Sequence, residues 1–133
     1  MAAKIDDLWI LTETGVVLFD HRHIDIDPSL FGAMMSALNN FANAISEDGM
    51  MGFELNHLNS VIHIFKQKHL LFVASCSKKL KEKKIQKMLK AIATQFFEKY
   101  QKFFASDDFI HSFDGEITAF SDFGNDIDDY LVD

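Results

Sequence analysis

The chain has 133 residues, 48% of them hydrophobic, so it is long enough for one domain with a core and too short for two ordinary domains. Its formal net charge of −7 argues against nucleic acid as the main partner, because phosphate binding requires a basic face. Cys76 is the only cysteine, which favours a reducing compartment. No segment approaches the roughly 20 apolar residues that cross a bilayer. We therefore expect one cytoplasmic domain over residues 1–133 without a transmembrane segment.

Two apolar runs open the chain, at residues 5–12 and 16–23. They flank Glu13, Thr14 and Gly15. Because glycine readily adopts the positive φ of a tight turn, the pattern predicts a β-hairpin. Both runs carry apolar residues at consecutive positions, as in LWIL and VVLF, which favours a sheet covered on both faces.

The next predicted element is a helix from Pro28 to about Ser46. Asp27 is suited to the N-cap and Pro28 to the first turn. Apolar residues at three- and four-residue spacing predict one apolar face, made of Leu30, Met34, Leu38, Phe41 and Ile45.

Three strand-like runs follow: FELNHL from Phe53, VIHIF from Val61 and LLFVASC from Leu70. The breaks between them, NS and KQKH, are short and polar. They predict hairpins between antiparallel neighbours and bring the sheet to five strands.

Helical periodicity returns from Lys79 to about Phe104. One stripe of this helix is apolar and is expected to cover the second face of the sheet, with Ile85, Met88, Leu89, Ile92, Phe96, Tyr100 and Phe103. A short acidic helix at the end of the chain is predicted from Phe120, Phe123, Ile127 and Tyr130 or Leu131. The fold class is therefore α+β, with one helix on one face of the sheet and two on the other.

This element order resembles the longin domain and its profilin-like relatives. The resemblance rests on LWILTETGVVLFDHR, DPSLFGAMMSALNNFANAI, MMGFELNHLNSVIHIFKQKHLLFVASCS and FDGEITAFSDFGNDIDDYL, and it is closest to small stand-alone archaeal longin proteins. It implies a longin/profilin-like five-stranded antiparallel sheet in the spatial order 2-1-5-4-3. The roadblock fold is a weaker match, because it begins with a helix and only a few residues precede Ile5.

The resemblance also implies a function. Longin domains generally do no chemistry and act as docking units in membrane-traffic and small-GTPase systems. It implies a homodimer or heterodimer with another longin or roadblock domain, and a small GTPase as a further partner. Pairing would use the edge of the third strand and the first helix, through Phe53, Leu55, His57, Met35, Asn39 and Ala42. Trafficking longins often precede a SNARE helix and an anchor, and nothing follows Asp133, so a role in driving membrane fusion is not expected.

The histidines do not favour a metal site or a titrating cluster. His21 and His23 could place two imidazoles at one strand end, but no third metal ligand has a recognisable spacing. His57, His63 and His69 fall on three neighbouring predicted strands and could titrate together near neutral pH. We favour the interpretation that these three histidines occupy separate positions at strand ends or edges.

The remaining candidate sites are also better explained as ordinary structural features. No base is identifiable for Cys76 as a nucleophile, and the acidic ending lacks a calcium loop with its closing Glu. The Lys-rich helix allows at most weak peripheral membrane contact, because its apolar stripe is needed by the sheet. We therefore expect no catalytic, cofactor or metal site.

Three function classes follow from these observations. The leading hypothesis is a non-enzymatic protein-interaction module. The alternative is a small-ligand sensory domain of profilin-like fold, which the abundance of Phe and Met would suit. An enzyme acting through His21 and Asp20 is the least favoured.

Overall fold

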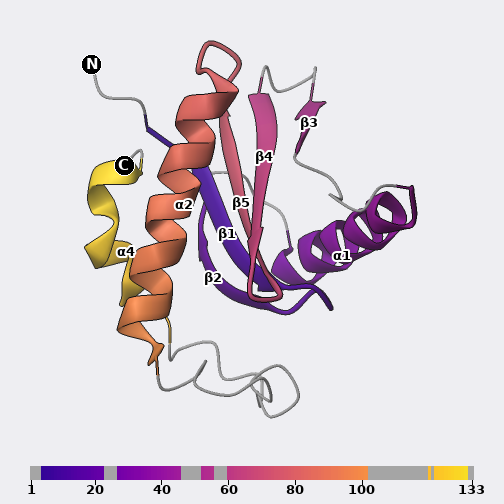
Figure 1. The fold of residues 1–133 in the computed structure, drawn as a ribbon, viewed down its shortest axis with the longest axis horizontal. Coiled ribbons are helices and arrows are strands. Elements are labelled where there is room, and N and C mark those ends of the chain that lie inside the picture. The colour runs from indigo at the N-terminus through magenta and orange to yellow at the C-terminus, as the bar shows by residue number, and fades with distance from the viewer. Residues whose placement is uncertain are drawn as a thin grey trace.

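The computed structural model of the chain describes residues 4–22, 27–45, 52–55, 60–101, 120 and 122–131. These residues form a sheet with helices on both faces (Figure 1) and confirm the α+β class. His23, His57 and Phe103, which the sequence analysis named, lie outside the described residues.

The described strands form one antiparallel sheet. They are β1 (Asp7–Thr12), β2 (Val17–His21), β3 (Gly52–Leu55), β4 (Ser60–Gln67) and β5 (Leu70–Ser77). Their order across the sheet is β2-β1-β5-β4-β3, so the hairpin β1–β2 and the meander β3–β4–β5 meet where β1 pairs with β5. β2 and β3 are the two edges.

Two tight turns hold the hairpins together. Gly15 has a φ of +100°, which supports the glycine turn predicted from the sequence. The turn from β4 to β5 consists of Lys68 and His69 alone, with φ of 51° and 66°. The four-residue break predicted at KQKH is therefore too long. Positive φ at both central residues matches the twist of a two-residue hairpin and lets β4 continue to Gln67.

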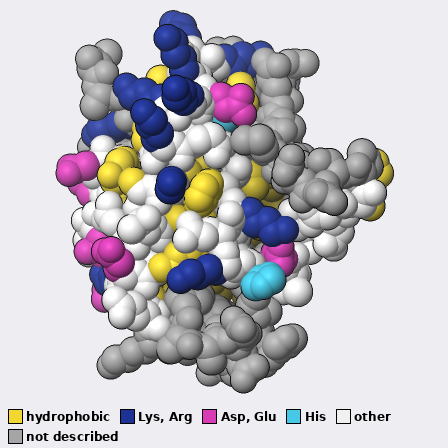
Figure 2. Space-filling model, viewed as in Figure 1, with side chains coloured by type: hydrophobic (Ala, Val, Ile, Leu, Met, Phe, Trp, Pro, Cys, Tyr) yellow, Lys and Arg dark blue, Asp and Glu magenta, His cyan; other side chains and the backbone are white. Residues whose placement is uncertain are grey.

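Helix α2 (Glu82–Lys99) covers one face of the sheet, together with α4 (Phe123–Asp126) and the 3-10 turn η4 (Asp128–Tyr130) (Figure 1). The predicted apolar stripe is buried there, with Ile85, Met88, Leu89, Ile92, Phe96 and Tyr100. Lysines gather on the outer side over the first half of α2 (Figure 2). This leaves α2 one apolar and one basic face.

Helix α2 is shorter than the sequence pattern predicts. It starts at Glu82 and not at Lys79, because the backbone of Lys81 is extended, with φ −75° and ψ 137°. The N–H of Leu80 donates to the carbonyl of Ser77 at 3.1 Å, so a turn precedes the helix. At the other end the helix stops at Lys99, before the predicted end near residue 104. The final predicted helix is likewise split into α4 and η4.

Helix α1 (Pro28–Ile45) packs on the other face, with bounds close to those predicted. The core on this face is smaller and comprises Trp9, Leu11, Phe31, Met35, Ile62, Ile64, Leu71 and Val73. Two of its members are aromatic: the rings of Trp9 and Phe31 stack with centroids 4.1 Å apart. The sheet is thus buried on both faces, as its consecutive apolar residues predicted.

Candidate interaction surface

Asp27 caps the first turn of α1. Its Oδ1 accepts hydrogen bonds from the backbone N–H groups of Ser29 at 2.8 Å and Leu30 at 3.2 Å. Its carbonyl accepts a third from Phe31 at 3.0 Å. These bonds satisfy backbone donors that a helix N-terminus leaves unpaired. Asp27 is therefore the N-cap that the sequence predicted.

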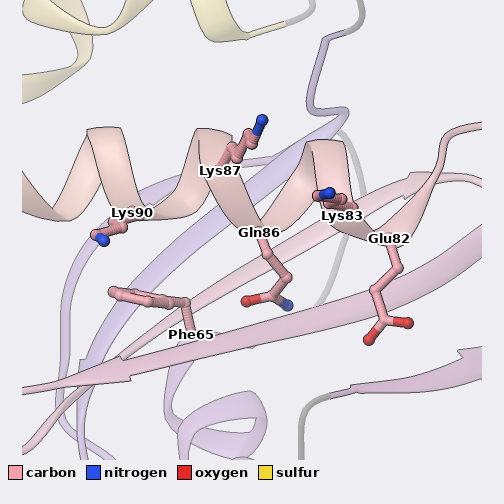
Figure 3. A pocket seen from close by; sticks show the side chains of 6 residues that line it. All are labelled: Phe65, Glu82, Lys83, Gln86, Lys87 and Lys90. Carbon is pink, nitrogen blue, oxygen red and sulfur yellow. The ribbon is translucent and has the colours of Figure 1, made fainter.

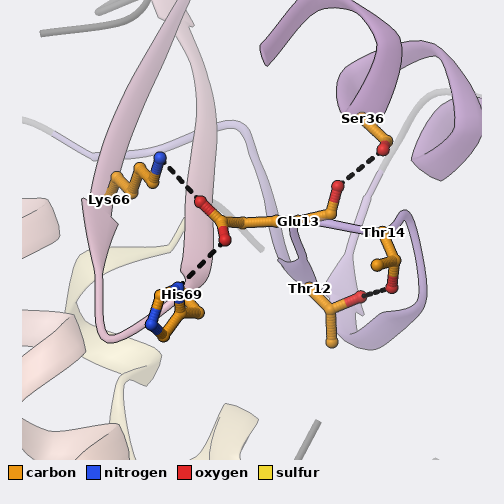
Figure 4. A network of polar contacts seen from close by, with 6 residues as sticks. All are labelled: Thr12, Glu13, Thr14, Ser36, Lys66 and His69. Atoms are coloured by element: carbon orange, nitrogen blue, oxygen red, sulfur yellow. Dashed lines mark hydrogen bonds and ion pairs between the residues drawn. The ribbon is translucent and has the colours of Figure 1, made fainter. Parts of the chain in front are cut away.

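A contact between two glycines sets how closely α1 approaches the β1–β2 turn. A Cβ placed on Gly32 would lie 2.0 Å from the carbonyl oxygen of Gly15, so no side chain fits there. One turn further along α1, the hydroxyl of Ser36 donates to the carbonyl of Glu13 at 2.5 Å (Figure 4). Together these contacts fix which side of α1 faces the sheet.

Glu13 joins this turn to the β4–β5 hairpin (Figure 4). Its carboxylate lies 2.6 Å from Lys66 Nζ and 3.1 Å from His69 Nδ1. Burial raises the pKa of the Glu13 carboxyl, but the hydrogen bonds and charges of Lys66 and His69 together lower it by more, so the net pKa is below its ordinary value. The carboxylate is thus charged at neutral pH, and it braces the end of the sheet on which α1 sits.

The side of α1 that faces the sheet carries only part of the apolar face that the periodicity predicted: Leu38 packs partly buried against the core, whereas Leu30, Met34 and Phe41 are exposed. Phe31, Met35 and Asn39, at i, i+4 and i+8, are buried. Met35 and Asn39, which were predicted to contact a partner, are buried on the side of α1 that faces the sheet. Ala42 is half-buried. The Nδ2 group of Asn39 has no hydrogen-bond partner among the described residues, and neither has Nε1 of Trp9.

The opposite side of α1 is apolar and exposed, and we call it the outer stripe. Its large side chains are the only exposed large hydrophobics on the described helices: Leu30 is 66% exposed, Met34 42% and Phe41 67%. Ala37 and Ala44 complete it and are also exposed. Figure 2 shows apolar side chains at the surface where α1 projects from the sheet. Exposed apolar groups arranged in one stripe are typical of a contact surface.

Strand β3 is the edge strand on the side of the sheet away from the β1–β2 hairpin. It pairs with β4 from Gly52, opposite His63, to Leu55, opposite Ser60. Phe53 and Leu55, both predicted to contact a partner, lie in this strand. An edge strand offers backbone groups for pairing with another chain.

The other residues considered from the sequence have structural surroundings. His63 is buried, and burial lowers the pKa of its imidazole while the charge of Glu82 opposes that shift. Burial raises the pKa of the Cys76 thiol to about 12, so this cysteine carries no reactive thiolate at neutral pH. Among the residues that the structure describes, no group of three or more His, Cys, Asp or Glu could hold a metal ion.

In comparisons with known proteins, the chain matches no family model and no curated protein sequence. Function is therefore inferred from the surface itself. In the described part of the chain, no helix is both long and apolar enough to cross a membrane.

Sequence reasoning missed two parts of this surface. The contact between Gly32 and Gly15 joins residues that are distant in the sequence, and the only available signal was a glycine inside a helical pattern. Glu13 was assigned only to a turn, and nothing in the sequence signals its ion pairs with Lys66 and His69.

Proposed function

We propose that this chain is a non-enzymatic protein-interaction module that pairs with a second copy of itself, or with a related longin or roadblock domain. The outer stripe of α1 is the observation that carries the proposal. Burying Leu30, Met34 and Phe41 would remove from water the large apolar side chains that α1 leaves exposed. β3 is an edge strand of the described sheet, and it is a second element on which a partner strand could add.

The spacing of the outer stripe suits a partner helix. Leu30, Met34, Ala37, Phe41 and Ala44 alternate in steps of four and three residues, which is the repeat by which helices pack along a shared seam. At about 100° per residue they lie within an arc of about 80°. Leu30 and Ala44 lie seven residues on either side of Ala37, so two copies can cross in antiparallel fashion with Ala37 near the two-fold axis.

A longin-type assignment is part of this proposal. The strand order β2-β1-β5-β4-β3, with α1 on one face and α2 with α4 on the other, supports it. In that setting the paired module would present a platform to a small GTPase or to a trafficking-like complex. The small residues of the stripe, Ala37 and Ala44, favour close approach of a second helix.

We expect the wild-type chain to be a dimer by light scattering coupled to size exclusion across a concentration range. The double variant Met34→Glu and Phe41→Glu should be a monomer, because it places charges of one sign on both sides of the seam. The control is Asn40→Glu with Asn43→Glu, which introduces the same two negative charges on exposed positions of the same helix outside the stripe. It should remain a dimer.

A wild-type monomer at the highest concentration, with no capture of a longin, roadblock or GTPase partner, would contradict the proposal. If the stripe variant remains a dimer, the dimer contact is not made by the outer stripe of α1, and the β3 edge becomes the candidate. Circular dichroism of each variant reports whether the fold is retained.

The second candidate is a small-ligand sensor, and one observation favours it. Trp9 Nε1 and Asn39 Nδ2 are buried donors on the α1 face that lack a hydrogen-bond partner among the described residues. A ligand carrying an acceptor would satisfy such donors. A chain that stays monomeric in the light-scattering experiment, with and without the stripe substitutions, favours this candidate over the first.

A further inference from the structure

A groove lies on the face of the sheet opposite α1, between β4 and the first half of α2 (Figure 3). Its volume is about 470 Å³, and its lining is Phe65, Glu82, Lys83, Gln86, Lys87 and Lys90. The proposed pairing through α1 does not use it. A partner seated here and a second copy on α1 would be on opposite faces of the sheet.

The floor of the groove is apolar and held in place. Phe65 is half-buried, and its ring packs against Phe72 with the centroids 6.4 Å apart. Gln86 reaches down from α2 and donates from Nε2 to the carbonyl of Ile64 at 3.4 Å, so its stem forms one wall beside the ring (Figure 3). A fixed, partly open aromatic surface can accept one apolar side chain.

The rim of the groove is basic. Lys83, Lys87 and Lys90 stand on α2 at i, i+4 and i+7, all three are exposed, and none forms an ion pair among the described residues. In Figure 3 Lys90 lies at the Phe65 end of the groove, Lys87 projects away from the ring, and Glu82 lies at the other end of the groove. The positive rim therefore extends from Lys83 to Lys90, and a carboxylate marks one end. This charge favours an anionic occupant with a defined direction.

The shape favours a peptide over a bilayer surface. A membrane-bound amphipathic helix inserts its apolar face, but that face of α2 is buried against the sheet, with Ile85, Leu89 and Ile92 fully covered. Among the residues that line the groove the apolar one is Phe65, which lies between β4 and α2 (Figure 3). A narrow chain segment can reach a recessed ring, whereas a flat surface cannot.

We propose that this groove binds an acidic segment of a partner protein that carries one large apolar side chain. The apolar side chain packs on Phe65, and the flanking carboxylates pair with Lys83, Lys87 and Lys90. Repulsion from Glu82 keeps the acidic residues toward the Lys90 end.

The test is a titration of the isotopically labelled full chain, followed by amide resonances in NMR. The probe is the blocked peptide Glu-Glu-Phe-Glu-Glu, and the peptide controls are Glu-Glu-Ala-Glu-Glu and Lys-Lys-Phe-Lys-Lys. We expect the first peptide to shift the amides of Phe65, Gln86 and Lys87. Loss of the aromatic ring should weaken binding about tenfold, and reversal of charge should abolish it.

Two lysine variants that remove the same charge distinguish binding in the groove from general attraction of an acidic peptide to a basic helix. The triple substitution Lys83→Gln, Lys87→Gln and Lys90→Gln should weaken binding of the first peptide about tenfold. The control is the triple substitution Lys79→Gln, Lys81→Gln and Lys84→Gln, which removes the same charge from exposed positions outside the groove lining. It should change the affinity for the first peptide less than threefold, which is about the effect of long-range attraction alone.

Three results would overturn the proposal. The first is an equal loss of affinity in both triple variants, and the second is equal binding of the Phe and Ala peptides. The third is groove-lysine-dependent sedimentation with vesicles of phosphatidylcholine and phosphatidylserine in the absence of peptide binding, which would assign the lysines to a membrane surface. None of these results bears on pairing through α1, which is measured separately by the solution mass.

Discussion

Replacing Gly32 with alanine is expected to lower the free energy of unfolding by about 3 kcal/mol, although the same change in an ordinary helix raises stability by roughly 1 kcal/mol. The reason is the 2.0 Å separation between the position of a Cβ on Gly32 and the carbonyl oxygen of Gly15. Both sides of this contact are backbone, so no side chain can rotate away. Relieving this clash requires α1 to move away from the turn, which loosens the stacking of Trp9 on Phe31.

Gly124→Ala is the matched control for this prediction. A Cβ on Gly124, in α4, would lie 3.5 Å from Cζ of Phe19, which is an ordinary contact distance. We expect its stability to be unchanged or raised by up to about 1 kcal/mol. Urea unfolding followed by circular dichroism measures both variants. Equal stability of Gly32→Ala and wild type would mean that α1 does not rest on the β1–β2 turn as described.

Phe96→Ala is expected to be the most destabilising single truncation, by about 4 kcal/mol. Phe96 is fully buried and joins α2 to β5 and to the C-terminal segment. Its ring contacts five other aromatic rings at centroid distances of 5.0 to 5.9 Å, namely Phe72, Phe97, Tyr100, Phe120 and Phe123. Removing it leaves a cavity where these elements meet.

The same substitution at Phe41 provides the contrast. Phe41 is 67% exposed on the outer stripe, so Phe41→Ala should change the free energy of unfolding of the monomer by about 0.5 kcal/mol or less. The comparison is made by urea unfolding at high dilution, where pairing does not contribute to stability. A loss at Phe41 as large as that at Phe96 would mean that the outer stripe is buried within the chain, and the proposed surface would not exist.

The two long helices differ in how far their sequences predict their packing. In α2, the lysines of the first half lie on one side and the apolar residues on the other, so the stripe from Ile85 to Phe96 has a single way to be buried, and the prediction is confirmed. In α1, apolar residues cover more than half of the circumference. Periodicity alone could not choose between the side of Leu30, Met34 and Phe41 and the side of Phe31 and Met35.

The choice in α1 is made by a contact that is distant in sequence. Gly32 is the residue that permits close approach to Gly15, and it lies next to Phe31 on the buried side. Local patterns carry no information about such a pair. The two-residue turn at Lys68 and His69 was missed for a related reason, since positive φ is uncommon for residues such as Lys and the pairing of β4 with β5 imposes it.

The central claim is that the outer stripe of α1 pairs with its own copy, and a disulfide cross-link tests it most directly. Cys76 is fully buried with a thiol pKa of about 12, so it contributes no background reactivity. Ala37→Cys places a thiol at the centre of the stripe, and Asn43→Cys places one on an exposed position outside it. After mild oxidation, a non-reducing gel should show a covalent dimer for Ala37→Cys and little for Asn43→Cys. Equal cross-linking of the two variants, or none for Ala37→Cys, would contradict the account.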